Sequence, residues 1–142
     1  SHYIAWWEGE SDELYTLKVY SLKDQKSKNI LEVQDVVLVY LSGFSADENF
    51  LYACYNEAGT LGSIQGCYAV NLKTSKVVGE VSGESVNPNP KDKNSVLVYK
   101  DSHCLCGGYE SFEYIYDIEL KTQGIYTKTF NECDKDCDEY YE

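Results

Sequence analysis

The sequence contains no arginine and no methionine, only two prolines, and no long apolar run. Its longest uninterrupted apolar stretch, residues 36–41, is far shorter than the roughly 20 residues of a membrane-spanning helix. Twelve lysines stand against 24 aspartates and glutamates, so the formal net charge is −12. Such a charge repels phosphate backbones and attracts basic partners. The sequence therefore predicts no membrane span and no nucleic acid target.

The apolar and aromatic content is that of a folded protein. The chain has 142 residues, of which 43% are hydrophobic and 14% aromatic. This length suits one domain, and the composition argues against disorder. We expect a single domain over residues 1–142 that ends in an acidic tail at 131–142.

A short repeated motif suggests the architecture. β-branched and aromatic residues dominate the periodic segments, which predicts an all-β fold. Leu22, Leu72 and Leu120 each precede a lysine at the end of a predicted strand, 50 and 48 residues apart. This spacing predicts three units, at residues 3–41, 48–83 and 95–130. Each unit is expected to be a three-stranded antiparallel meander, and together they form a minimal propeller or prism. The alternative is a two-sheet β-sandwich.

An even number of cysteines in a short chain indicates a disulfide framework. The C-x-C and C-x3-C spacings differ from the C-x2-C pairs of zinc sites, which favours disulfides over the alternative of bound zinc. Cys104 and Cys106 are poorly placed to bridge each other, so their expected partners are Cys133 and Cys137. The six cysteines are Cys54, Cys67, Cys104, Cys106, Cys133 and Cys137. The remaining two would then close the loop between residues 54 and 67.

Disulfides also indicate a compartment. They persist in oxidising surroundings such as the periplasm and the cell exterior. The sequence opens with Ser1 and His2 in place of an initiator methionine. These features fit a mature periplasmic or secreted protein whose signal peptide has been removed.

Three polar loops lead from the first to the second predicted strand of each unit, at residues 8–13, 56–66 and 101–110. If the units are equivalent, these loops emerge on one side of the molecule. The first loop is strongly acidic, and the other two combine glycine and serine with protruding apolar residues. A cysteine-pinned loop loses little entropy on docking, although glycine and serine also simply make turns. The partner-binding candidates are Leu61, Ser63, Ile64, Gln65, Ser102, His103, Leu105, Gly108, Tyr109 and Ser111.

No residue pattern indicates catalysis. Asp101, Ser102 and His103 are consecutive and cannot fold back into a nucleophilic relay. Carboxylate pairs are expected by chance among so many acids, and no phosphate-binding loop or two-histidine metal motif is present. The acidic segment 134–139 lacks the glycine turn and the later glutamate of an EF-hand, which argues against calcium. We therefore expect no enzyme, no catalytic residue, no cofactor and no metal.

Two short segments carry a resemblance to a known class of proteins. The sequences GSIQGCY at 62–68 and CGGYES at 106–111 lead from small residues into aromatic strands. In this they resemble loops of small periplasmic inhibitors of peptidoglycan-cleaving enzymes, namely lysozyme inhibitors and the immunity proteins of type VI secretion amidases. The resemblance implies a protein that inserts glycine and serine loops into the cleft of a basic hydrolase or amidase. The alternative is a secreted carbohydrate-binding or adhesion module that uses the 14 tyrosines and two tryptophans.

Overall fold

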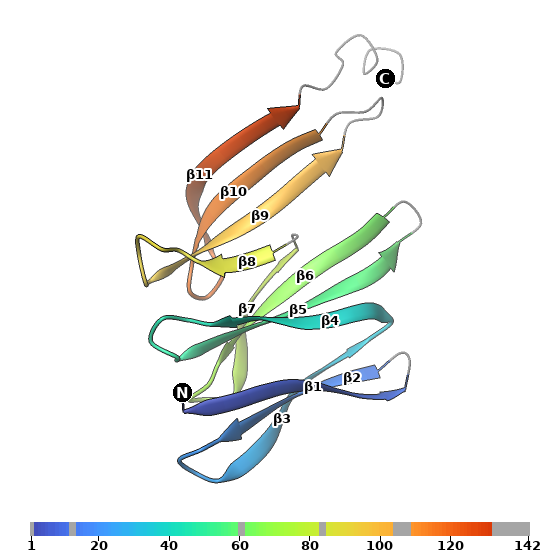
Figure 1. Cartoon of the computed structure of the whole chain (residues 1–142), viewed down its shortest axis with the longest axis vertical. Coiled ribbons are helices and arrows are strands. Elements are labelled where there is room, and N and C mark those ends of the chain that lie inside the picture. The colour runs from blue at the N-terminus through green and yellow to red at the C-terminus, as the bar shows by residue number, and fades with distance from the viewer. Residues whose placement is uncertain (1, 12–13, 60–61, 83–84, 104–108, 132–142) are drawn as a thin grey trace.

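A computed structural model of the chain describes residues 2–11, 14–59, 62–82, 85–103 and 109–131 (Figure 1). Within these ranges the protein is all-β and contains no helix, which confirms the predicted fold class. The strands form three antiparallel sheets, which we call the first, middle and last sheets. The first sheet contains β1 (Tyr3–Ser11), β2 (Leu14–Ser21) and β3 (Lys26–Gln34). The middle sheet contains β4 (Val36–Phe44), β5 (Phe50–Gly59), β6 (Gly62–Asn71) and β7 (Lys76–Ser82). The last sheet contains β8 (Ser85–Pro88), β9 (Ser95–His103), β10 (Tyr109–Asp117) and β11 (Thr122–Asn131).

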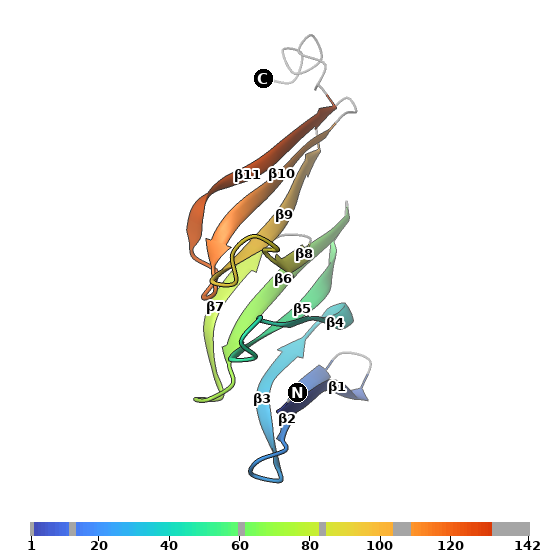
Figure 2. The same cartoon turned by 60° about the vertical axis from the view of Figure 1, so that its left-hand side comes forward.

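The three sheets follow one another in a row, in the order of the chain (Figures 1 and 2). Each is a meander of sequential antiparallel strands, so the propeller-like arrangement holds and the two-sheet sandwich does not. The described sheets have three, four and four strands, whereas three strands each were expected. Residues 36–41 were assigned to the first unit, but as part of β4 they belong to the middle sheet. The chain changes sheets at Asp35, whose φ of 57° interrupts the extended backbone.

The middle sheet is buried on both faces. Side chains alternate across a strand, so Tyr52 and Cys54 of β5 face the last sheet while Leu51 and Ala53 face the first. All four are fully buried. This explains the uninterrupted apolar sequence of residues 50–54, which is typical of a strand covered on both sides. The outer two sheets each bury one face against the middle sheet.

Hydrogen bonds from side chains join neighbouring sheets. The indole nitrogen of Trp7 donates to the carbonyl of Tyr40 over 3.0 Å, which links β1 to β4. The hydroxyl of Ser42 donates to the carbonyl of Val86, which links β4 to β8. Trp7 packs against the core while Trp6 is 36% exposed. We predicted this difference because adjacent residues on a strand face opposite ways.

Two of the repeated Leu-Lys motifs form the same turn. In residues 22–25 the turn ends at Gln25 with a φ of 53°, and in residues 72–75 it ends at Ser75 with a φ of 59°. The third turn differs, because there Leu120 itself has a φ of 62°. The Leu-Lys motif therefore marks a turn in all three units, but the backbone conformation of the turn is shared only by the first two.

Cys54 and Cys67 form a disulfide between directly paired positions of β5 and β6. Both cysteines are buried in the core cluster between the middle and last sheets. This confirms the predicted pairing of these two residues. The other four cysteines, Cys104, Cys106, Cys133 and Cys137, lie outside the described residues, as does the tail from residue 132.

Candidate functional site

The hairpins β1/β2, β5/β6 and β9/β10 extend toward one side of the row (Figure 1). We call this the hairpin side, made of residues 8–11, 56–59, 62–65, 101–103 and 109–111. The opposite, turn side carries the connections at 22–25, 45–49, 72–75, 89–94 and 118–121. The expectation that the three loops share one side therefore agrees with the direction of their flanking strands.

The two sides differ in charge. Eight of the 12 lysines lie in or within three residues of the turns on the turn side: Lys23, Lys26, Lys28, Lys73, Lys76, Lys91, Lys93 and Lys121. Six acids lie in the same segments: Asp24, Asp47, Glu48, Asp92, Asp117 and Glu119. The residues of the hairpin side include five acids and no lysine: Glu8, Glu10, Glu57, Asp101 and Glu110. Glu8 forms an ion pair with Lys18 of β2. The net charge of −12 is therefore distributed unevenly, with its negative part toward the hairpins.

The predicted loops are shorter than expected. β5 continues to Gly59 and β6 begins at Gly62, and these two residues are themselves paired. Most of the expected loop at 56–66 is therefore hairpin strand, and the same holds for residues 101–103 and 109–110 of the third loop. The error arose because glycine and serine favour turns in isolation, whereas here the strand ladder continues through them.

The structure brings the candidates into two groups. Ser63, Ile64 and Gln65 lie on β6, where Gln65 is half-buried and paired with Asn56. On the β9/β10 hairpin, His103 pairs with Tyr109, Ser102 with Glu110 and Ser111 with Asp101. Leu61, Leu105 and Gly108 lie outside the described residues. The two groups belong to different sheets and share only the hairpin side.

Sequence reasoning missed an aromatic pair beside the first group. The rings of Tyr55 and Tyr68 stack with their centroids 5.5 Å apart and an interplanar angle of 28°. Tyr55 pairs with Gly66 and covers it, since a Cβ on Gly66 would meet the Tyr55 ring at 2.6 Å. Burial first, then Tyr55 and Glu80, raise the pKa of Tyr68 to about 12. The sequence signal that could have indicated this contact is a glycine paired with an aromatic residue across two strands.

A second missed feature is an unpaired acceptor. Among the described side chains, the Oδ1 atom of Asn56 is buried without a hydrogen-bond partner. Asn56 lies one residue after Tyr55 and so faces the opposite surface of the middle sheet. A buried acceptor without a donor costs about 1–3 kcal/mol.

Two aromatic residues of β10 pack against the core. Tyr116 is 5% exposed, and Tyr114 packs against the same core cluster. The ammonium group of Lys100 lies 5.4 Å from the centroids of both rings. These rings therefore pack within the protein and do not form the exposed platform that carbohydrate binding requires.

The described residues include no group of three or more histidine, cysteine, aspartate or glutamate side chains arranged to hold a metal ion. Within the same residues, no helix is long and apolar enough to cross a membrane.

Comparison with solved structures shows a likeness of fold. No protein family matches the sequence, and no curated protein matches it. Among solved structures, the chain is similar to the acylaminoacyl peptidase of Pyrococcus horikoshii, with a TM-score of 0.55 and 15% sequence identity. The match covers 92% of this chain and 24% of the peptidase. At this identity the likeness concerns the fold alone, and the chain spans about a quarter of the peptidase's length.

Proposed function

We propose that this protein binds a basic protein through its hairpin side. We further propose that the partner is a cell-wall hydrolase or amidase, and that the protein inhibits it. The hairpins at 56–66 and 101–111 would enter the cleft of that enzyme. This inhibition would take place in the periplasm or outside the cell. The observation that carries the proposal is that three hairpins from three sheets extend to one side, whose residues include five acids and no lysine.

Charge supports this orientation. An uneven charge distribution steers a basic partner toward the acidic side and raises the rate of association. Glu8 and Glu57 are described acidic side chains on that side, in the first and middle sheets. An interface of ordinary size, on the order of 1,600 Å² in total, needs contributions from more than one hairpin.

Rigidity supports it as well. The Cys54–Cys67 disulfide and the Tyr55–Tyr68 stack both join β5 to β6 near the middle of the hairpin. A hairpin that is already ordered loses less conformational entropy when it docks.

A charge-reversal experiment tests the proposal. The protein is titrated into peptidoglycan digestion assays with a panel of basic lysozymes and amidases, and the variants Glu57→Lys and Ser63→Arg are compared with wild type. Glu119→Lys on the turn side is the matched control, since the exposed Glu119–Lys121 pair contributes little to stability. We expect stoichiometric inhibition of at least one enzyme, lost in the two hairpin variants and kept in the control. Inhibition that Glu119→Lys abolishes equally, or retention on glycan beads without inhibition, contradicts the proposal.

A further inference from the structure

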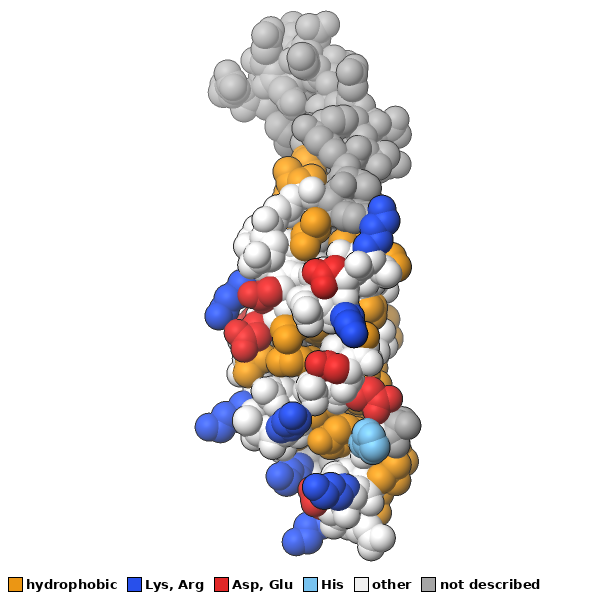
Figure 3. All heavy atoms as spheres, turned by 90° about the vertical axis from the view of Figure 1, so that its left-hand side faces the viewer, with side chains coloured by type: hydrophobic (Ala, Val, Ile, Leu, Met, Phe, Trp, Pro, Cys, Tyr) orange, Lys and Arg blue, Asp and Glu red, His pale blue; other side chains and the backbone are white. Residues whose placement is uncertain are grey.

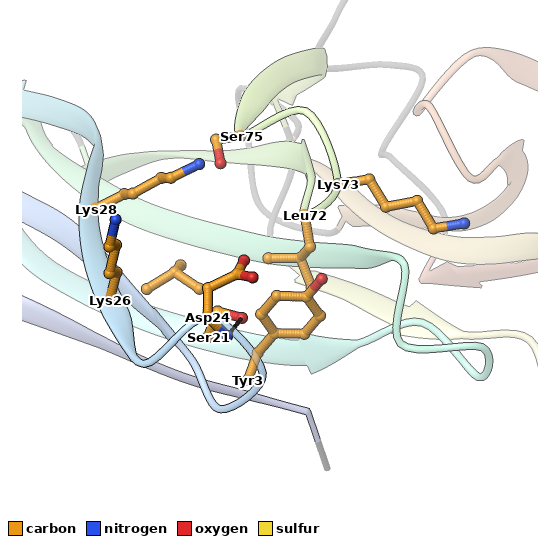
Figure 4. Close-up of a pocket in the computed structure, with 9 residues that line it drawn as sticks. Tyr3, Ser21, Asp24, Lys26, Lys28, Leu72, Lys73 and Ser75 are labelled. Atoms are coloured by element: carbon orange, nitrogen blue, oxygen red, sulfur yellow. Dashed lines mark hydrogen bonds between the residues drawn. The ribbon is translucent and has the colours of Figure 1, made fainter.

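The turn side contains a cavity between the first and middle sheets. Its volume is about 390 Å³, within the range of small-molecule sites. It lies between the turn that follows β2 and the turn that follows β6 (Figure 4). The lining residues are Tyr3, Val19, Ser21, Asp24, Lys26, Lys28, Leu72, Lys73 and Ser75.

Strand register explains why lysines enter this cavity. In the β2/β3 pair, Lys28 lies opposite Val19 and Lys26 lies opposite Ser21. Paired residues share a face of the sheet, and Val19 is buried against the middle sheet. Lys26 and Lys28 therefore project from the face that packs on the middle sheet, at the point where the apolar core ends. Figure 4 shows the Lys28 ammonium group directed toward the hydroxyl of Ser75, while Lys73 extends away from both.

The cavity is positive in a strongly negative protein. Lys26, Lys28 and Asp24 give its lining a formal charge of +1, and Lys73, whose ammonium group extends away, would raise this to +2, against −12 for the chain. Within the described residues, neither Lys26 nor Lys28 forms an ion pair with an acid. Lysines also gather over the first sheet on the turn side, which faces the viewer in Figure 3. Two ammonium groups on neighbouring positions of one strand face repel each other unless an anion lies between them.

We propose that this cavity binds the phosphate or sulfate ester of a small molecule. Lys26 and Lys28 would contact the oxyanion, with the hydroxyl groups of Ser21 and Ser75 as further donors. Val19 and Leu72 provide an apolar wall for the organic part of the ligand. The shared chemistry is a tetrahedral oxyanion with three terminal acceptor oxygens, which match two ammonium groups and two hydroxyls better than the two oxygens of a carboxylate do. This site lies on the side opposite the proposed protein interface and is independent of it.

Asp24 sharpens the prediction. Its carboxylate lines the same cavity and opposes the binding of an anion there. Its backbone N–H donates to the Ser21 hydroxyl oxygen over 3.2 Å, a bond that an asparagine keeps. Asp24→Asn therefore removes one negative charge without removing the backbone contact that holds the turn.

The test is calorimetric titration of the full chain with inorganic phosphate, inorganic sulfate, glucose 6-phosphate and glucose. We expect glucose 6-phosphate to bind and glucose not to bind, while the two inorganic ions distinguish phosphate from sulfate as the preferred group. Lys26→Gln/Lys28→Gln should weaken binding about tenfold or more, and Asp24→Asn should strengthen it. The matched control is Lys23→Gln/Lys76→Gln, which removes two turn-side lysines that do not line the cavity, and it should alter affinity less than about twofold.

Three outcomes overturn the proposal: no binding of any anionic probe, equal weakening by the two double variants, or equal binding of glucose and its phosphate. Thermal unfolding separates binding from folding. All four substituted lysines are exposed, so the variants should unfold at the wild-type temperature, and glucose 6-phosphate should raise that temperature only where Lys26 and Lys28 are present.

Discussion

Gly79 of β7 lies directly against the backbone carbonyl of Glu119 in the turn between β10 and β11. A Cβ atom at position 79 would overlap this carbonyl oxygen. The contact brings the edge strand of the middle sheet to a turn of the last sheet, beside the buried Leu120. Packing between these two sheets therefore depends on the absence of a side chain at one position.

Gly79→Ala should destabilise the protein by roughly 1–3 kcal/mol, because β7 or the turn must move to admit the methyl group. The measurement is the free energy of unfolding in urea. Gly9→Ala is the control, since the atom nearest to its Cβ would belong to the ring of Tyr15, at 3.1 Å, and a side chain moves more easily than a backbone. Equal decreases in the free energy of unfolding in the two variants would contradict the prediction that the Gly79 contact is the more sensitive one.

Removal of the disulfide by Cys54→Ala/Cys67→Ala should cost on the order of 2–4 kcal/mol. The bond closes a loop with a sequence separation of 13 and is buried in the core. Urea unfolding of the variant and of wild type, each with and without reductant, measures the loss. Because the variant lacks this bond, reductant should destabilise it less than it destabilises wild type.

The remaining cysteines are expected to form two further disulfides. Alkylation of the denatured, unreduced protein followed by mass spectrometry should then detect no free thiol among the six cysteines. Peptide mapping should link Cys104 and Cys106 to Cys133 and Cys137. Four alkylated thiols, or a bound zinc ion, would contradict this prediction.

Asp47 should make stability depend on pH in the acid range. Its carboxylate accepts hydrogen bonds from the hydroxyl of Ser45 at 2.6 Å and the N–H of Asn49 at 3.1 Å, and these lower its pKa below the ordinary 3.8. Since the folded state favours the charged form, this stabilisation is complete above that value and disappears as pH falls through the lowered pKa. Unfolding measured from neutral to acid pH should show a smaller acid-induced loss in Asp47→Asn than in wild type.

Tyr68 should ionise at a higher pH than an ordinary tyrosine. Its pKa is raised to about 12, so the folded state retains the proton and stability falls as pH rises above the ordinary value of 10. Tyrosine ionisation, followed by ultraviolet absorbance, should show a smaller transition at high pH in Tyr68→Phe than in wild type. An unchanged late phase in that variant would contradict the predicted burial of the hydroxyl.

Part of the candidate site could be predicted from sequence. The spacing of Leu22, Leu72 and Leu120 identified three units, and equivalent units must present equivalent hairpins on one side. The pairing of Cys54 with Cys67 followed from elimination among few possibilities. The Tyr55–Tyr68 stack and the unpaired Asn56 acceptor did not follow, because each depends on which residue lies opposite in the ladder.

The cavity lined by Lys26 and Lys28 could not be predicted from the sequence either. Lys26 and Lys28 read as solvent-exposed residues near a turn, since nothing local specifies which face of β3 packs on another sheet. The pairing of Lys28 with Val19 decides it. One change of register would move both lysines to the outer face.

The sequence by itself determined the all-β class, the three-unit organisation and the net charge, because these follow from periodicity, spacing and composition. Tertiary structure decided which sheet each strand joins and what each repeated residue contacts. Leu72 and Leu120 pack against the preceding sheet in the row and are 6% and 5% exposed. Leu22 has the same motif but is 46% exposed, because no described sheet precedes the first. Burial depends on the neighbour across the interface, which a local motif does not specify.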